Sequence, residues 1–386
     1  MFKKIALVCL VSLMSFQAKA QEKKTQIYLD DSQPIELRVE DALSKMTLEE
    51  KVAMLHAQSK FSSPGVPRLG IPEFWTTDGP HGIRPEVKWD EWDQAGWTND
   101  SIIAYPALTA LSATWNKKMS WNYGKALGEE ARYRKKDILL GPGVNIYRTP
   151  LNGRNFEYMG EDPFLSSKMV VPYIKGVQSN GVAACVKHYA LNNQEQFRHT
   201  SNVIVDDRAL YEIYLPAFEA SIKEAKAYSI MGAYNKFRGE YLCENDYMLN
   251  KILRDEWGFK GIVVSDLGAI KYLQTTHYVT DSPKESIRQA IAAGVDMQFY
   301  DFTNEFWQTS IIELVNEKKL TMEQIDRAAG GVLRLKFMLG LFENPYTDKN
   351  LIKERFHTKE NQAVALEAAQ KSMILLKNEN NILPLK

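Results

Sequence analysis

The chain has no excess of charge of either sign. Among its 386 residues, Lys and Arg total 48 and Asp and Glu also total 48, which gives a net charge of zero. Surfaces that bind nucleic acid or an anionic membrane are rich in basic residues, because they must neutralise phosphates. The charge balance therefore gives no reason to expect either nucleic acid or a membrane as a partner.

Cysteine is also scarce. The sequence has three cysteines, and Cys9 falls within the segment that we expect to be removed on export. The remaining pair, Cys185 and Cys243, is too few for the disulfide framework of a small secreted domain. We expect these two thiols not to pair.

A long apolar run is missing as well, and the apolar stretch at the N-terminus is short. Lys3 and Lys4 precede a mostly apolar run from Ile5 to Phe16, and Ala18-Lys19-Ala20 forms an A-x-A cleavage site. A membrane-spanning helix needs about 20 apolar residues. Residues 1–20 are therefore predicted to be a secretory signal peptide, which places the mature protein in the periplasm or outside the cell.

Several motifs that mark other enzyme classes are absent. The sequence has no Gly-rich dinucleotide fingerprint, no HExxH spacing, no phosphate-binding Gly loop and no internal repeat. The histidines outside the strand-end motifs lack the spacing of metal ligands. These absences argue against a dehydrogenase, a metalloprotease and a repeat protein.

From about residue 130 onward, apolar segments alternate with helical patterns. Leu210, Ile213 and Tyr214 begin a helical periodicity that predicts a helix over 208–226, and Thr47 with Glu50 forms a capping box. Strands that alternate with helices indicate parallel βα units. We expect an α/β fold of the (β/α)8 TIM-like barrel type. The strand candidates are Asp137–Tyr147, Gly181–Ala190, Tyr228–Tyr234, Gly261–Asp266 and Gly294–Phe299.

Polar clusters follow these apolar segments. Asp266 comes directly after the buried-strand pattern Ile262–Val264 and Ser265, where a barrel of this type keeps its reactive groups. Asp78, Arg154, Lys187-His188 and Tyr234 hold comparable positions. Such a mixture of charged and hydroxyl groups suits a ligand rich in hydroxyls. Three of these residues also have a structural interpretation. Asp266 could be a helix N-cap, Asp78-Gly-Pro could be a turn, and Arg154 could pair with Glu157 or Glu161.

The order of these motifs resembles the catalytic barrel of glycoside hydrolase family 3, which includes retaining β-glucosidases. The resemblance runs from about Arg38 to the last residue and is strongest in five segments: DGPHGIR (78–84), GPGVNIYRTPLNGRNFEYMGEDP (141–163), KHYALNNQE (187–195), MGAYN (231–235) and VVSDLGA (263–269). It implies an exo-β-glycosidase, most simply a β-glucosidase. The substrate would be a small glycoside or an oligosaccharide, with no metal or organic cofactor.

The resemblance also assigns roles. Asp266 matches the nucleophile, which would form a covalent glycosyl intermediate, and nearby cations are expected to lower its pKa. The residues that match the sugar-binding positions of the first subsite are Asp78, Arg84, Arg154, Lys187, His188, Arg198 and Tyr234.

Two departures from the family pattern stand out. Leu267 occupies the position after the nucleophile where family members usually have Trp. The single-domain β-N-acetylhexosaminidase branch carries an Asp-His acid/base pair in the loop after the Lys-His strand, but this chain has Asn192-Asn-Gln-Glu195 and Arg198-His199-Thr200 there. The resemblance therefore implies that a second domain supplies the acid/base.

The C-terminal residues fit that expectation. LLKNENNILPLK (375–386) resembles the family's entry into an α/β sandwich domain. We expect a signal peptide over 1–20, the barrel over 21–360, and a linker with the start of a truncated second domain over 361–386. A helix over Ala363–Ala369, a strand over Ser372–Lys377 and a turn over Asn378–Asn381 are predicted. Apolar segments at 373–376 and 382–385 would be unpaired, which predicts association into homo-oligomers.

Two alternatives remain open. A β-xylosidase or α-arabinofuranosidase of the same family would use the same framework with a different first subsite. A sugar-binding protein without catalysis would explain the missing acid/base and Leu267.

Overall fold

The computed structural model describes residues 26–59, 61–84, 93, 102–299, 301–344 and 355–385. The predicted signal peptide lies outside the described residues. In the part of the chain that is described, no helix has both the length and the apolar character needed to cross a membrane.

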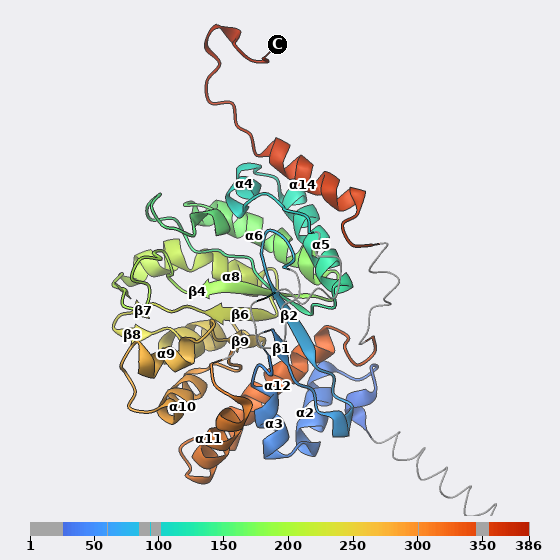
Figure 1. The fold of residues 1–386 in the computed structure, drawn as a ribbon, viewed down its shortest axis with the longest axis vertical. Helices are drawn as coiled ribbons and strands as arrows, with labels where there is room; N and C mark the ends of the chain where they lie inside the picture. The colour runs from blue at the N-terminus through green and yellow to red at the C-terminus, as the bar shows by residue number, and fades with distance from the viewer. Residues whose placement is uncertain are drawn as a thin grey trace, which may run out of the picture.

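The centre of the molecule is a curled parallel sheet (Figure 1). Its strand β4 (Ala183–Tyr189) is buried along its whole length. The neighbouring strands in order are β1 (Ser62–Ser63), β2 (Phe74–Asp78), β3 (Ile138–Leu140), β4 (Ala183–Tyr189), β6 (Ser229–Gly232) and β9 (Ile262–Val264). All neighbours from β2 to β9 are parallel, as expected for strands that are joined by helices.

Two short bridged segments close this sheet into a ring. Val264 pairs in parallel with Met297, and Gln298 pairs in parallel with His56. From there a tight hairpin, in which Ser59 pairs with Ser62, leads back to β1. The α/β barrel expected from the sequence is confirmed, and of the candidate strand Gly294–Phe299 only Met297 and Gln298 form bridges.

The ring departs from a regular βα repeat at its start. β1 runs antiparallel to β2. Only residues 64–73 separate β1 from β2, fewer than the dozen or more that a helical crossover needs, so the chain turns back on itself. β1 and β2 therefore form a hairpin rather than a βα unit.

Helices cover the outside of the ring (Figure 1). The predicted helix over 208–226 is present as α7 (Asp207–Ala209), a π-helical segment (Leu210–Tyr214) and α8 (Pro216–Lys223), and the capping box at Thr47 begins α3 (Leu48–Met54) as expected. The helices are α2 (Ile35–Lys45), α3 (Leu48–Met54), α4 (Leu108–Ala113), α5 (Lys117–Tyr133), α6 (Pro163–Gln178), α7 (Asp207–Ala209), α8 (Pro216–Lys223), α9 (Ala269–Thr275), α10 (Pro283–Ala293), α11 (Asn304–Asn316), α12 (Met322–Met338) and α14 (Lys359–Lys371). A further π-helical segment covers Tyr247–Glu256, and a small outer sheet joins β5 (Asn202–Val203), β7 (Lys236–Phe237) and β8 (Glu240–Tyr241).

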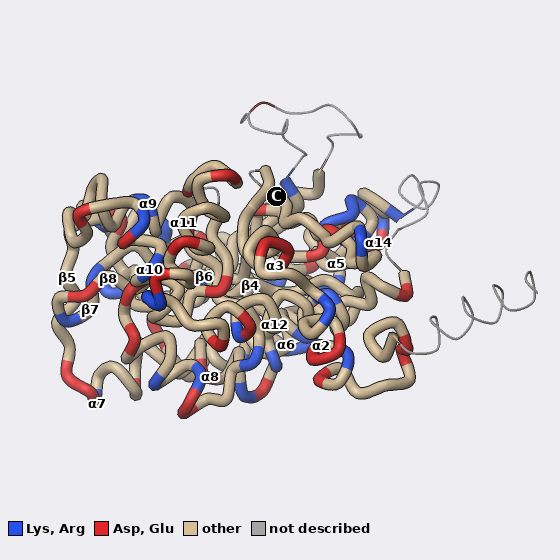
Figure 2. The backbone as a smooth tube through the Cα atoms, turned by 90° about the horizontal axis from the view of Figure 1, so that it is seen from below, with Lys and Arg blue, Asp and Glu red and all other residues tan. Residues whose placement is uncertain are grey.

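Basic and acidic residues are interspersed along the elements that Figure 2 shows. This mixed pattern agrees with the net charge of zero.

Among the described C-terminal residues, α14 and the residues just before it pack on the barrel. α14 contains the predicted helical stretch 363–369 and lies against α4 and α5. The predicted strand Ser372–Lys377 is wrong, because residues 373–377 form no ladder with any described residue. An isolated strand has no partner for its backbone groups, and here Met373 and Leu376 are 74% and 93% exposed. Figure 1 shows this segment extending away from the barrel.

Candidate active site

The predicted site residues gather where the parallel strands end. Asp78 is the last residue of β2, and Lys187 and His188 lie near the end of β4. Tyr234 and Asp266 each follow the end of a strand by two residues, β6 and β9 respectively. The carboxyl ends of parallel barrel strands share one rim, so the fold brings together side chains that are far apart in the sequence.

Lys187 lies between two carboxylates. Its Nζ is 2.9 Å from Glu157 Oε1 and 3.2 Å from Asp78 Oδ1, and only 3% of the residue is exposed. Burial alone would lower the pKa of Lys187, but the charges of Asp78 and Glu157 outweigh burial and raise this pKa. Lys187 is therefore a fixed ammonium group in the floor of the site.

Asp78 is the more exposed of the two carboxylates that contact Lys187. Burial would raise the pKa of Asp78, but the Lys187 charge and the bond from the Gly79 N–H lower it below its ordinary value. The Asp78 side chain remains 43% exposed. An ionised carboxylate that is both fixed and accessible can accept hydrogen bonds from hydroxyl groups of a ligand.

Glu157 was missed as a site residue by the sequence reasoning. The structure places it, almost fully buried, at the end of a short 3-10 turn, with Arg154 Nη2 at 2.7 Å and Lys187 Nζ at 2.9 Å. Burial would raise its pKa, but Lys187 and Arg154 outweigh burial and lower it. The pairing of Arg154 with Glu157, which the sequence left open as a structural alternative, is thus present. It also anchors two of the predicted sugar-binding residues.

His188 is buried and neutral. Burial and the charges of Arg154 and Lys187 hold its pKa well below the usual range. Arg154 Nη2 lies 3.0 Å from His188 Nε2, and because a guanidinium only donates, Nε2 must accept. The proton is then on Nδ1, which donates to the Tyr158 hydroxyl at 3.2 Å. The 3.8 Å approach of Nε2 to Asp266 is consequently not an ion pair.

Asp266 is enclosed, and its side chain is 14% exposed. Its Oδ1 accepts the N–H of Leu267 at 2.7 Å. Burial raises the pKa of Asp266, and this bond and the charges of Arg154 and Lys187 offset the rise only in part. The nearby cations lower this pKa as expected, but the net shift is upward because burial outweighs them. The physical reason is that those cations are already paired with other carboxylates, while Asp266 has lost water.

Tyr234 and Arg198 flank the residue that follows Asp266. The Tyr234 hydroxyl donates to the Leu267 carbonyl at 2.5 Å, and the Arg198 guanidinium lies 4.5 Å from the centre of the Tyr234 ring. Arg198 Nη1 is also 2.9 Å from Glu195 Oε2. Burial, together with the charge of Asp266, raises the pKa of Tyr234, so the ring keeps its hydroxyl proton.

Arg84 differs from the other predicted residues. Its backbone N–H donates to the Asp78 carbonyl at 3.2 Å, while its guanidinium lies 5.7 Å from the centre of the Phe61 ring. The backbone of the turn after β2 therefore determines its position beside the site.

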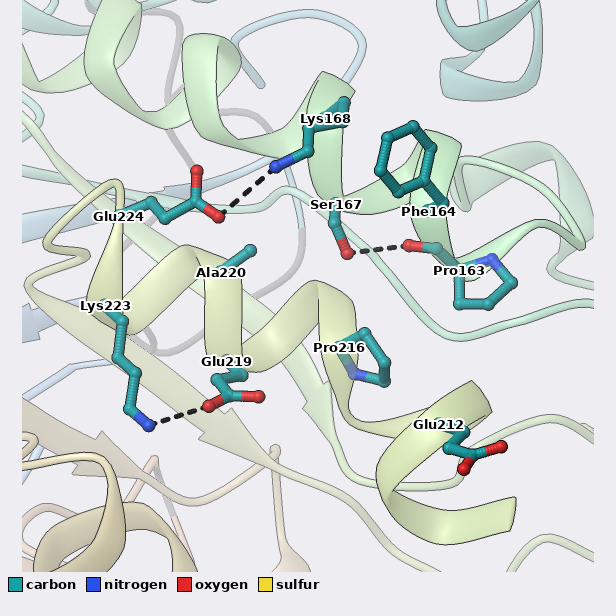
Figure 3. A pocket seen from close by; sticks show the side chains of 10 residues that line it. All are labelled: Pro163, Phe164, Ser167, Lys168, Glu212, Pro216, Glu219, Ala220, Lys223 and Glu224. Carbon is teal, nitrogen blue, oxygen red and sulfur yellow. Dashed lines mark hydrogen bonds and ion pairs between the residues drawn. The ribbon is translucent and has the colours of Figure 1, made fainter. Parts of the chain in front are cut away.

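A separate hollow lies on the outside of the barrel between α6 and α8 (Figure 3). It has a volume of about 510 Å³, and none of the predicted site residues lines it. Across the described ranges, no group of three His, Cys, Asp or Glu side chains could hold a metal ion.

Residues 42–335 match the model of the glycosyl hydrolase family 3 N-terminal domain. The chain belongs to this family. It is 51% identical over 374 residues to "Beta-glucosidase BoGH3A" of Bacteroides ovatus, an alignment that covers 96% of this chain and 49% of the relative. An exo-alpha-(1->6)-L-arabinopyranosidase of Bifidobacterium breve is 36% identical, over 89% of this chain and 42% of its own length.

Solved structures of this family have the same fold. Beta-glucosidase 3B from Thermotoga neapolitana in complex with glucose superimposes with a TM-score of 0.78 at 36% identity, over 90% of this chain and 48% of that one. The chain spans about half the length of the curated relatives it matches.

Proposed function

We propose that this family 3 chain is the barrel of an exported, retaining exo-β-glycosidase, a β-glucosidase, with Asp266 as its nucleophile. One observation carries the proposal: Asp266 is an enclosed carboxylate on the same barrel rim as Asp78, Lys187 and Arg154. Relatives named beta-glucosidases support glucose as the sugar.

In this mechanism the terminal sugar binds against the charged floor of the site. Asp78 accepts hydrogen bonds from sugar hydroxyls, and Lys187 has three donors, of which Glu157 and Asp78 take two. These charge-assisted bonds hold the ring so that its anomeric carbon faces Asp266. The ionised Asp266 then displaces the aglycone and forms a glycosyl ester, which water cleaves in a second displacement.

The raised pKa of Asp266 has a consequence for this step. A carboxylate with fewer compensating bonds is a better nucleophile, but it must still be ionised at the working pH. The activity should therefore fall on the acidic side as Asp266 takes up a proton.

The acid/base is proposed to come from the second domain expected from the sequence. A general acid needs a raised pKa, whereas Lys187 and Arg154 lower the pKa of Glu157. Glu157 therefore suits the role of an anchor better than that of a proton donor.

Pentose specificity is the second candidate. It is favoured by the relative named an arabinopyranosidase and by Leu267, which presents no aromatic ring beside the nucleophile. A panel of aryl β-glucosides, β-xylosides and α-arabinosides decides between these sugars by their kcat/KM.

The nucleophile is tested with an activated 2-deoxy-2-fluoro-β-glucoside and mass spectrometry of the labelled peptide. We expect one label on Asp266, no label on Asp266→Asn, and normal labelling of Asp281→Asn, a matched change at an exposed aspartate. A label on another carboxylate would refute the assignment. Export is tested separately, by N-terminal sequencing of the mature protein, which should begin at Gln21.

A further inference from the structure

Asp301 is a buried carboxylate beside the loop that carries Asp266. Its Oδ1 accepts the N–H of Gly268 at 2.8 Å, and its Oδ2 accepts the N–H groups of Ile270 at 2.6 Å and Lys271 at 3.2 Å. Burial raises the pKa of Asp301 to about 7, because the three N–H bonds offset the loss of water only in part and the Asp266 charge adds to the rise. Burying a carboxylate costs free energy, so the hydrogen bonds that Asp301 makes to this loop need an explanation.

The loop from Asp266 to Ala269 is a tight turn. The Asp266 carbonyl accepts the Ala269 N–H at 2.9 Å, and Gly268 has φ 80° and ψ 0°. These are the angles of the third residue of a type II turn, which favours glycine. A Cβ at Gly268 would also lie 3.1 Å from the Tyr272 ring. In such a turn the Leu267–Gly268 peptide is the central one.

This central peptide is held at both ends. Tyr234 donates to its oxygen at 2.5 Å, and Asp301 accepts from its N–H at 2.8 Å. Types I and II of this turn differ by a rotation of the central peptide, and glycine at the third position tolerates both. A rotated peptide would point its oxygen at the Asp301 carboxylate, so Asp301 opposes the rotation.

Rotation of this peptide would affect Asp266 through the Tyr234 hydroxyl. While the peptide is fixed, the Tyr234 hydroxyl is occupied by the Leu267 carbonyl. Asp266 acts on Tyr234 through its charge and as a hydrogen-bond partner, so the two side chains lie close together. If the peptide rotated, the Tyr234 hydroxyl would lose the Leu267 carbonyl and donate to the Asp266 carboxylate alone, which would weaken this carboxylate as a nucleophile.

We propose that Asp301 is a positioning residue, which locks the Leu267–Gly268 peptide so that the Leu267 carbonyl draws the Tyr234 hydroxyl toward the backbone and weakens its hold on the Asp266 carboxylate. This inference rests on the proposed function, because it presumes that Asp266 reacts with a sugar.

The test measures how fast the activated fluoroglucoside labels Asp266 in the full-length protein, with the maximal rate separated from the affinity. Asp301→Ala should lower the maximal rate by about tenfold to a hundredfold and change the affinity little, since the defect is in geometry. Asp301→Asn, whose side-chain oxygen can still accept from Gly268, should recover part of the rate. In a Tyr234→Phe background Asp301→Ala should slow labelling much less, because that side chain has no hydroxyl to donate to Asp266.

Asp296→Asn is the matched control. Asp296 is as deeply buried as Asp301. It accepts the N–H of Val263 at 2.8 Å, on strand β9 and away from the turn. It should lower the melting temperature without slowing the labelling. A wild-type protein that is not labelled at Asp266 would overturn the proposed function and the inference with it. Normal labelling rates in both Asp301 variants, or additive losses in the double variant, would overturn the inference alone.

Discussion

The buried carboxylate of Glu157 gives the sharpest test of how the site is held together. It is 6% exposed and contacts two cations, Lys187 at 2.9 Å and Arg154 at 2.7 Å. Glu157→Gln keeps the shape of the side chain but removes its charge. Removal of one partner from a buried ion pair leaves the other charge uncompensated. Here Asp78 still offsets part of the Lys187 charge, and Glu195 offsets part of the Arg154 charge. We therefore expect the free energy of unfolding at pH 7 to fall by about 3–5 kcal/mol.

The sign of the pH dependence follows from the pKa of Glu157. The folded state lowers this pKa below its ordinary value of 4.5, so the contribution of Glu157 is present above that value and is lost as the pH falls through the lowered pKa. The difference in stability between wild type and Glu157→Gln should accordingly shrink toward acid pH. Urea unfolding from pH 7 down to about pH 3 measures this difference.

The controls separate the ion pair from other effects. Glu161→Gln makes the same change on an exposed glutamate of the same loop and should leave the stability nearly unchanged. A double-mutant cycle with Lys187→Met should give a coupling of more than about 1 kcal/mol. Equal stabilities of Glu157→Gln and Glu161→Gln, or a coupling of zero, would refute this account of the site.

Three further predictions concern stability and the turn. Glu130 is buried and its pKa is raised from 4.5 to about 7, chiefly by burial, so folding loses stability as the pH rises between these values, and Glu130→Gln should be more stable than wild type at pH 8 by roughly 3 kcal/mol in chemical denaturation. Gly268→Ala forces a side chain into a left-handed conformation and should cost about 1–2 kcal/mol in the same assay; an unchanged stability would contradict the turn geometry. Tyr234→Phe removes the hydroxyl that could donate to Asp266, so it should slow labelling of Asp266 much less than Asp301→Ala does, while sugar affinity, measured by calorimetry, stays within about threefold, a change near 0.6 kcal/mol.

Much of the barrel follows from the sequence because its signals are local. A β-branched run such as Ile262–Val264 that ends in Ser and Asp indicates a buried strand and the place where it stops. Once parallel strands are inferred, their ends must share one rim, so Asp78, Lys187 and Asp266 could be placed together in advance.

The features that the sequence did not predict have a common cause: they depend on contacts between residues that lie far apart in the sequence. Nothing in the periodicity indicates that Glu157 rather than Glu161 is buried against Lys187. The pKa of Asp266 depends on how much water it loses and on which carboxylates already occupy the cations. The apolar residues 373–376 have strand propensity, yet no described strand lies beside them.

The closure of the ring imposes an order on folding. The bridge that completes the barrel joins His56 to Gln298, and Lys51 on α3 pairs with Asp326 on α12 at 2.6 Å. During synthesis the N-terminal hairpin therefore emerges long before the segments that cover it. Its edges remain open while most of the barrel is translated, and such unpaired edges favour association with other chains. The last strand of the barrel thus acts as the closing step of a slow, long-range assembly.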